Sequence, residues 1–392
     1  MHCSFTVPLS SLALIFASLA YGADWNRQAL EDAKQDRTAL IYDGIKPDSM
    51  VCDTTVREMS DGSWLLFILA GDTREPSPKN YIGVSRSTDQ GKTWSKLEAF
   101  DCGLPRSGRT MGQGPTEFIV TDAETILFFA THGGTYSWGK TWQSWLMRGD
   151  TAGKTWGKPE LLPGRLGHNC FIRSHIVAHD GRLIVPFQHY LRLPQDDAAS
   201  YDQDRKLCDP RVGVLISSDT GKTWAEHGNI RLSNDPRYFG WAEPSIVELA
   251  DGTIKMTIRA DGLGGALYAA ESKDGGLTWP DLAVKTDIPN PGSKATLFSL
   301  GGDAVALVHN PNPKHRSPLA LWISFDGMKT WPYRRTLVAE SVDGPKGNLN
   351  YPEGFVSKDR QWLDIVYDNN RHQACLIAAK LPPQNTWAKG VR

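Results

Sequence analysis

Ser87-Thr-Asp-Gln-Gly-Lys-Thr-Trp94 is one copy of an eight-residue motif, Ser-x-Asp-x-Gly-x-Thr-Trp, that recurs along the chain. Residues 217–224 and 272–279 are clean copies, and residues 324–331 have methionine in place of the glycine. Residues 149–156 keep only Gly-Lys-Thr-Trp in register. The tryptophans, at positions 94, 156, 224, 279 and 331, are 62, 68, 55 and 52 residues apart. This period suits a four-stranded blade with its loops, so the repeat predicts a β-propeller.

The motif is expected to form a tight turn. Its Asp accepts hydrogen bonds from nearby backbone N–H groups, and its Gly tolerates positive φ. Short apolar runs at residues 81–85, 212–216 and 319–323 read as the flanking strands. We therefore expect the motif residues to hold the fold together and to carry no chemistry.

These motifs resemble the Asp-box (BNR) repeats of the sialidase superfamily. The resemblance implies an all-β protein, a six-bladed β-propeller of four-stranded antiparallel blades with Asp-box turns, and five boxes on six blades are usual in that family. A single sialidase-like domain is expected over residues 23–392. Residues 24–36 are the one segment with a helical pattern.

Composition limits the classes of partner. The chain has 392 residues, 40% of them hydrophobic, which is enough for a large core. A net charge of −1 supplies no basic field for nucleic acid or an anionic membrane, so neither partner is expected. No motif for a metal, phosphate or dinucleotide appears, and no cofactor is expected. Disulfide pairing and oligomeric state stay open.

The first 22 residues read as a secretory signal peptide. They carry no charged side chain, and Val7–Ala20 is an apolar stretch of 14 residues, too short to span a membrane. Ala20-Tyr-Gly22 offers small residues for cleavage after Gly22. A secreted or periplasmic protein is expected.

Glu243 begins an apolar strand, and Arg259 ends the strand that returns from the following Asp-Gly turn, 16 residues later. The inner strands of a propeller surround a central depression, and polar groups at strand starts converge there. The pair resembles a sialidase segment in which a Glu opens one strand and an Arg closes the next. The resemblance implies that Glu243 is the base for the nucleophile and that Arg259 is one of three arginines that bind the substrate carboxylate.

Two further stretches carry the resemblance. Asn310-Pro311 followed by Arg316 is similar to the family's Asn-Pro…Arg before the last box, which implies a second carboxylate-binding arginine. Tyr351 matches the family's nucleophilic tyrosine, and residues 367–371 resemble the final Tyr-Glu…Arg stretch. A phenol has a pKa near 10 and needs a base before it attacks, and Tyr-nucleophile sialidases are known exceptions among glycosidases. Arginine forks bind a carboxylate bidentately.

The first blade departs from the family pattern. Its expected arginine position falls on Cys52 or Asp53, in a stretch without Arg-Ile-Pro. Asp72 follows the next strand and is the predicted acid, with Asp53 as a second candidate, and Arg74 is predicted to supply a displaced guanidinium. A pocket with two arginines would also suit a uronic acid or another acidic sugar.

His175 lies in residues 167–175, where His, Asn and Arg gather at a strand start and predict pocket lining. The sequence thus predicts an exported, retaining exo-glycosidase that removes a terminal acidic sugar, sialic acid or a related one, from a glycan. One alternative is a lyase, or a glycosidase for uronic or deoxy sugars, that uses His175 or Asp53. Another is a propeller that binds glycans without catalysis.

Overall fold

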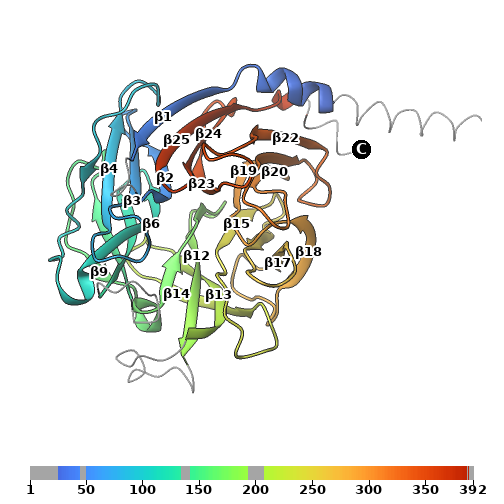
Figure 1. The fold of residues 1–392 in the computed structure, drawn as a ribbon. Coiled ribbons are helices and arrows are strands. Elements are labelled where there is room, and N and C mark those ends of the chain that lie inside the picture. The colour runs from blue at the N-terminus through green and yellow to red at the C-terminus, as the bar shows by residue number, and fades with distance from the viewer. Residues whose placement is uncertain (1–24, 45–49, 134–141, 193–206, 386, 388–392) are drawn as a thin grey trace, which may run out of the picture.

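The computed structural model describes residues 25–44, 50–133, 142–192, 207–385 and 387. The predicted signal peptide, residues 1–22, lies outside these residues. The strands form six antiparallel sheets arranged in a ring, and the chain passes round the ring in sequence order (Figure 1). Five of these sheets have four strands and one has five, so the predicted six-bladed β-propeller is confirmed.

The first three sheets run from the innermost strand outward. The first contains β2 (Cys52–Glu58), β3 (Trp64–Ala70), β4 (Tyr81–Ser87) and β5 (Glu98–Ala99). The second contains β6 (Gly112–Val120), β7 (Thr125–His132), β8 (Gln143–Gly149) and β9 (Glu160–Leu161). The third contains β10 (Cys170–Ile172), β11 (Ile176–Val177), β12 (Leu183–Arg192), β13 (Leu207–Ser217) and β14 (Ala225–Arg231). In this third blade, β10 and β11 both pair with β12, so its inner edge is split in two.

The last three sheets complete the ring. The fourth contains β15 (Pro244–Glu248), β16 (Ile254–Ile258), β17 (Ala266–Ser272) and β18 (Val284–Pro289). The fifth contains β19 (Thr296–Gly301), β20 (Ala304–His309), β21 (Leu319–Ser324) and β22 (Tyr333–Val338). The sixth contains β23 (Leu349–Val356), β24 (Trp362–Asn369), β25 (Gln373–Lys380) and, outermost, β1 (Arg37–Asp43). Because β1 comes from the beginning of the described chain and pairs antiparallel with β25, this blade closes the ring.

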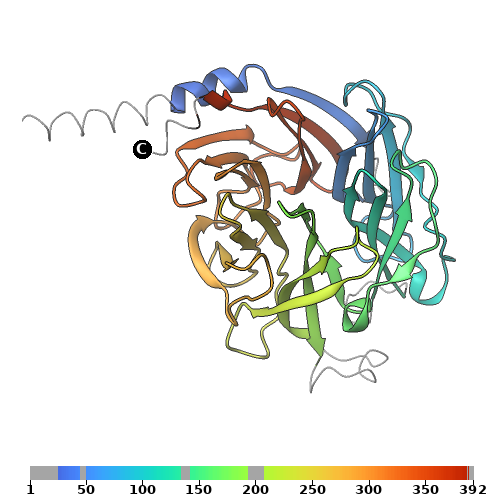
Figure 2. The ribbon, with the colours of Figure 1, turned by 180° about the vertical axis from the view of Figure 1, so that it is seen from behind.

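Helical structure is confined to short segments. Residues 25–33 are helical, within the segment that the sequence predicted, and two 3-10 turns are η1 (Gly108–Thr110) and η2 (Gly164–Gly167). Trp25 stacks on Phe325 with ring centroids 4.5 Å apart, and Asp32 accepts a hydrogen bond of 3.0 Å from Tyr333. The helix therefore covers the rim of the ring beside the fifth and sixth blades (Figure 2). In the described residues we find no helix with the length and apolar character needed to cross a bilayer.

The repeated motif connects the third and fourth strands of the first five blades. In the third blade, Asp219 accepts hydrogen bonds from the Thr223 amide (2.9 Å) and hydroxyl (2.6 Å). In the second blade the acceptor is Asp150, which lies one residue further from the glycine. Its carboxylate accepts a hydrogen bond of 2.7 Å from the Thr155 amide. Met328, in the glycine slot of the fifth blade, still adopts a φ of 68°. The degenerate copies thus form the same turn.

Apolar side chains fill the spaces between neighbouring sheets, whereas charged side chains gather along the axis of the ring. One apolar cluster joins Ile184 and Val214 of the third blade to Met256 of the fourth. Near the axis, buried Arg57 pairs with both Glu117 (2.6 Å) and Glu353 (3.1 Å). Cavities lie at the two ends of the inner strands, one of about 300 Å³ at their beginnings and one of about 510 Å³ at their ends.

Candidate active site

The smaller cavity collects ionisable and aromatic side chains from five of the six blades. Its lining consists of four arginines, three acidic residues and three aromatic residues: Arg173, Arg259, Arg316, Arg371, Glu75, Glu243, Asp261, Phe171, Trp241 and Tyr351. The predicted nucleophile, base and two carboxylate-binding arginines therefore lie around one space. No aliphatic side chain is among the described residues that line it.

Tyr351 projects from a bulge near the start of β23. The pairing register with β24 shifts between Asn350 and Glu353, and Tyr351 has a φ of 49°, an unusual value for a bulky residue. Strain of this kind persists where the surroundings enforce it, often at functional sites. The ring is 6% exposed. Burial raises the pKa of its phenol well above the usual range, and the negative charge of Glu243 adds to the rise.

Asp53 occupies a matching bulge at the start of β2, the neighbouring inner strand. The register of β2 with β3 shifts between Cys52 and Thr55, and Asp53 has a φ of 47°. A hydrogen bond of 3.1 Å from the Thr54 hydroxyl to the Tyr351 carbonyl joins the two bulges. The chain thus presents Asp53 and Tyr351 from equivalent positions on adjacent strands.

Glu243 precedes β15 and lies between two guanidinium groups. Arg259 donates to it at 2.9 Å, and Arg173 is 3.6 Å from its other oxygen. Burial alone would raise the pKa of Glu243, but the charges of Arg259 and Arg173 outweigh burial and lower it to about 2. Glu243 is therefore ionised at neutral pH. Among the described residues, no hydrogen bond joins its carboxylate to the Tyr351 hydroxyl.

The other arginines of the cavity differ in how much of their hydrogen-bonding capacity is already used. Arg259 also donates two bonds of 2.8 Å to Asp261. Arg316 donates to two neutral acceptors, the Asn350 side chain at 2.9 Å and the Gly292 carbonyl at 2.8 Å. An arginine has five N–H donors, so donors are left on both. Arg316 is the cavity arginine for which the described residues provide no ion pair.

The first-blade position at which the family pattern has an arginine falls on Cys52 or Asp53, and Asp53 forms an ion pair there. Asp53 accepts a hydrogen bond of 2.6 Å from Arg173, which follows β10 in the third blade. Both side chains are almost fully buried, at 6% and 3% exposed. The Arg173 guanidinium also lies over the rings of Phe171 (4.7 Å) and Tyr351 (5.8 Å). A guanidinium from another blade therefore reaches the space that the first blade leaves without one.

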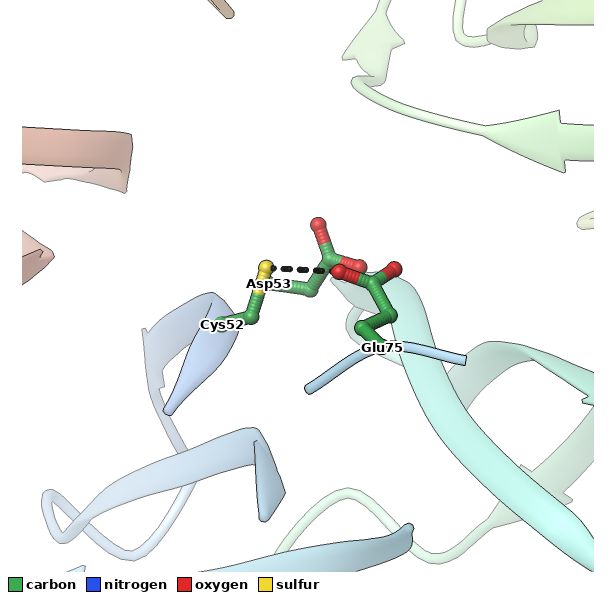
Figure 3. A group of neighbouring side chains, drawn as sticks. All are labelled: Cys52, Asp53 and Glu75. Atoms are coloured by element: carbon green, nitrogen blue, oxygen red, sulfur yellow. Dashed lines mark hydrogen bonds between the residues drawn. The ribbon is translucent and has the colours of Figure 1, made fainter. Parts of the chain in front are cut away.

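Glu75, from the loop between β3 and β4, completes the wall next to Asp53. Figure 3 shows Glu75 facing Cys52 and Asp53. The thiol of Cys52 lies 3.3 Å from one oxygen of Glu75, and Arg371 lies 3.3 Å from the same oxygen. Burial raises the pKa of Cys52 well above its usual range, so the thiol keeps its proton and donates a hydrogen bond to Glu75. One ligand atom from each of the three side chains lies within 4.8 Å of the others.

Asp72 and Arg74, predicted as acid and guanidinium, do not line this cavity. The Asp72 carboxylate accepts hydrogen bonds from the Ser77 hydroxyl and from the Thr73 amide at 2.6 Å. The Ser77 bond in particular lowers the pKa of Asp72. Arg74 is exposed, and its carbonyl accepts a bond of 3.2 Å from Asn80. The carboxylate of Asp72 thus stabilises the loop that carries Glu75 to the cavity.

His175 lies at the other end of the axis. It lines the 510 Å³ cavity together with Arg57 and Glu353, and its Nδ1 is 3.2 Å from Glu117. His175 therefore does not line the cavity that holds Tyr351 and Glu243. Within the predicted lining segment 167–175, Arg173 reaches the cavity of Tyr351 instead.

Four charged residues of the cavity were not assigned roles from the sequence: Glu75, Arg173, Asp261 and Arg371. Glu75 and Asp72 both follow the strand 64–70, and nothing in the spacing distinguishes them. Arg173 stands in a segment predicted to line the pocket, and Arg371 ends the stretch 367–371 that resembles the family's final motif. These two signals were present, but neither indicates which side chain enters the cavity.

Comparisons with known proteins agree with this architecture. The model of the BNR repeat-like domain matches residues 113–363. A sialidase of Bacteroides fragilis is 27% identical over 333 residues, which cover 76% of this chain and 56% of that protein. The chain thus spans about half the length of the curated relatives it matches.

Solved structures with the same fold include the Hadza microbial sialidase Hz136, with a TM-score of 0.64 at 23% identity over 85% of this chain and 66% of that chain. A Dyadobacter fermentans protein of unknown function has a TM-score of 0.66 at 18% identity, over 88% of this chain and 99% of that chain. With the matching family model, the boxes and the six-bladed ring, the chain belongs to the BNR repeat-like domain family and is a sialidase-like propeller.

Proposed function

We propose that the protein is a retaining exo-glycosidase that removes a terminal acidic sugar, sialic acid or a close relative, from a glycan. The observation that carries the proposal is the single cavity where Tyr351, Glu243 and four arginines meet. Its volume of about 300 Å³ is at the small end for ligand sites, which suits one sugar unit at a chain end. The similarity to proteins named sialidases supports the same substrate class.

In this proposal Tyr351 attacks the anomeric carbon and its proton passes to Glu243. A neutral phenol is not repelled by an anionic sugar, as a carboxylate nucleophile would be. With a pKa of about 2, Glu243 is a weak base in the free protein because two arginines attract its charge. A substrate carboxylate that binds Arg259 would weaken that attraction and make Glu243 more basic. Substrate binding and activation of the phenol are therefore coupled.

Arg316 and Arg259 bind the substrate carboxylate in this proposal. Within the described residues, Arg316 has donors left and no acidic partner, so its charge is available to an anion. Arg259 has two N–H donors left after its bonds to Asp261 and Glu243. Arg316 is the stronger candidate for recognition of the acid, since binding there displaces no ion pair.

Replacing Arg316 by alanine is expected to reduce kcat/KM for a fluorogenic aryl sialoside by at least about 30-fold, since one bidentate charge contact is lost. Hydrolysis of the carboxamide analogue should change much less, and Arg316→Lys should lie between, because lysine keeps the charge without the fork. Arg334→Ala is a matched control, since Arg334 lies over Trp322, outside the cavity. Equal losses on both substrates, or no turnover of any sialoside or uronide by the wild type, would contradict the proposal.

We also propose that the protein is exported, on the composition of residues 1–22. Expression of the full chain in a bacterial host with a secretion pathway should give mature protein that begins at Ala23. Amino-terminal sequencing measures this directly. Retention of Met1 in all of the protein would overturn the proposal of export.

A further inference from the structure

We propose that Asp53 and Glu75 form a carboxyl pair that holds one proton and delivers it to the leaving oxygen of the substrate. This inference rests on the proposed glycosidase function and adds the acid that Asp72 does not supply. Glu75 lines the cavity of Tyr351, and Asp53 lies beside Glu75 (Figure 3).

The two carboxyl groups are close and poorly solvated. Their oxygens lie within 4.8 Å of one another, and the side chains are 6% and 11% exposed. Two carboxylates at such a distance in a buried site resist full ionisation, so the pair favours a state with one proton. Burial raises the pKa of Asp53 to about 7, with Glu75 adding to the rise and Arg173 opposing it.

Each carboxyl group also has one oxygen engaged by a cation. Arg173 binds Asp53 at 2.6 Å, and Arg371 lies 3.3 Å from Glu75. Once the proton has left, the pair carries two negative charges, which these two guanidinium groups stabilise. The arrangement therefore suits a pair that keeps a proton at rest and releases it during the reaction.

The second oxygen of Glu75 is available for the transfer. Cys52 and Arg371 both contact Oε2, and in the described part of the chain no hydrogen bond engages Oε1. Because the thiol and the guanidinium fix one oxygen, the other is held in a defined position in the cavity wall. Cys52 is in this sense a positioning residue.

The proton balance closes over one catalytic cycle. In the first step the Tyr351 oxygen bonds to the anomeric carbon, its proton goes to Glu243, and the bond to the leaving oxygen breaks. That oxygen keeps the electron pair and takes the proton of the carboxyl pair. In the second step water attacks the anomeric carbon, gives a proton back to the pair and displaces Tyr351, which recovers its proton from Glu243.

Other titratable groups around the pair come from several elements. They are Arg173 after β10, Glu243 before β15, Lys294 before β19, Tyr351 on β23, Asp368 on β24, Arg371 after β24 and His132 at the end of β7. The same three side chains, Cys52, Asp53 and Glu75, resemble a set of metal ligands. A cation is disfavoured here because two guanidinium groups already balance the carboxylates.

The test compares two substrates that differ in their leaving group. The nitrophenolate of a nitrophenyl sialoside leaves without protonation, whereas the lactose oxygen of a sialyl-lactose must be protonated to leave. Glu75→Gln is expected to lower kcat/KM for sialyl-lactose by about 10²- to 10⁴-fold and to have little effect on the nitrophenyl substrate. Asp53→Asn should move the alkaline limb of the sialyl-lactose profile to lower pH, because the neighbouring charge that holds the proton is gone. Asp72→Asn should show no contrast between the leaving groups, because asparagine can still accept from the Thr73 amide and donate to the Ser77 oxygen, which keeps the loop of Glu75 in place.

Several results would overturn the proposal that Asp53 and Glu75 supply the proton. These are a leaving-group contrast in Asp72→Asn with none in Glu75→Gln, an unmoved alkaline limb in Asp53→Asn, or activity lost to EDTA and restored by a divalent metal. Hydrolysis of the nitrophenyl substrate by the wild type reports on the glycosidase function alone. A failure of the pair is therefore distinguishable from a failure of the proposed function.

Discussion

Tyr351→Phe is expected to lower hydrolysis of an acidic aryl glycoside by at least about 10³-fold, because it removes the atom that attacks the anomeric carbon in the first step of the proposed mechanism. The ring and its contacts remain, including the packing against Met50 and Leu69. The loss should therefore appear in kcat with little change in stability. Steady-state kinetics together with thermal unfolding separates the two effects.

Tyr367→Phe is the matched control for this variant. Tyr367 is also 6% exposed and lies on β24, but it packs in the apolar cluster between the fifth and sixth blades and does not line the cavity. Loss of the Tyr367 hydroxyl should leave kcat near the wild-type value. If Tyr351→Phe retained wild-type kcat, or if both variants lost activity alike, Tyr351 would not be the nucleophile.

Arg173→Met is expected to lower the free energy of unfolding by about 3–5 kcal/mol at pH 8, because it leaves two buried carboxylates without a shared cation. Arg173 binds Asp53 at 2.6 Å and lies 3.6 Å from Glu243, and its side chain is 3% exposed. Methionine fills a similar volume, so the change reports mainly on charge. Urea unfolding at several pH values measures the effect.

The pH dependence of this variant has a defined sign. In the wild type the pKa of Asp53 is raised to about 7, above the unfolded value of about 3.9. The folded state therefore binds the proton more tightly, and this group lowers the free energy of unfolding as pH rises from about 4 through 7. Without Arg173 that pKa rises further, so the variant's deficit should grow with pH. It should be smallest near pH 5.

A double variant tests the cause. Asp53→Asn together with Arg173→Met removes both charges of the pair and should recover part of the stability that Arg173→Met loses. Equal stability of the wild type and Arg173→Met between pH 5 and 8 would show that the pair does not stabilise the fold. If the double variant recovered no stability, the uncompensated charge of Asp53 would not be the cause of the loss.

The repeated motif explains why the fold could be predicted from the sequence. Each copy carries its own hydrogen-bond pattern, so the register of a blade is encoded locally and does not depend on distant contacts. Asp150 was harder to recognise, because one extra residue separates it from its glycine while its hydrogen bonds stay the same. Closure of the ring by β1 depends on pairing between residues more than 300 positions apart, for which the sequence carries no local signal.

The candidate site was only partly predictable for a related reason. Glu243 and Arg259 flank the open end of one hairpin, β15 and β16, so their spacing fixes their proximity, and Arg259 indeed bonds to Glu243. Arg173 and His175 are two residues apart at the split inner edge of the third blade, yet they line cavities at opposite ends of the axis. The sequence indicates the strand to which each side chain belongs, but not the end of the ring axis that the side chain reaches.

Loops set a further limit. Asp72 and Glu75 follow the same strand, and the hydrogen bonds from Thr73 and Ser77 decide that Asp72 stabilises the loop while Glu75 enters the cavity. Arg371 reaches the cavity from the turn after β24, where Asp368 binds its amide at 2.8 Å. These choices depend on tertiary contacts that no spacing rule contains.

We propose that Tyr351 forms a covalent bond to the sugar during turnover. Rapid acid quenching during turnover of a fluorinated sialoside, followed by peptide mass spectrometry, detects such a bond directly. We expect a glycosyl adduct on the peptide that contains Tyr351, and none in Tyr351→Phe. An adduct on Glu243 or Asp53, or turnover without an adduct and with inversion at the anomeric carbon, would contradict the claim.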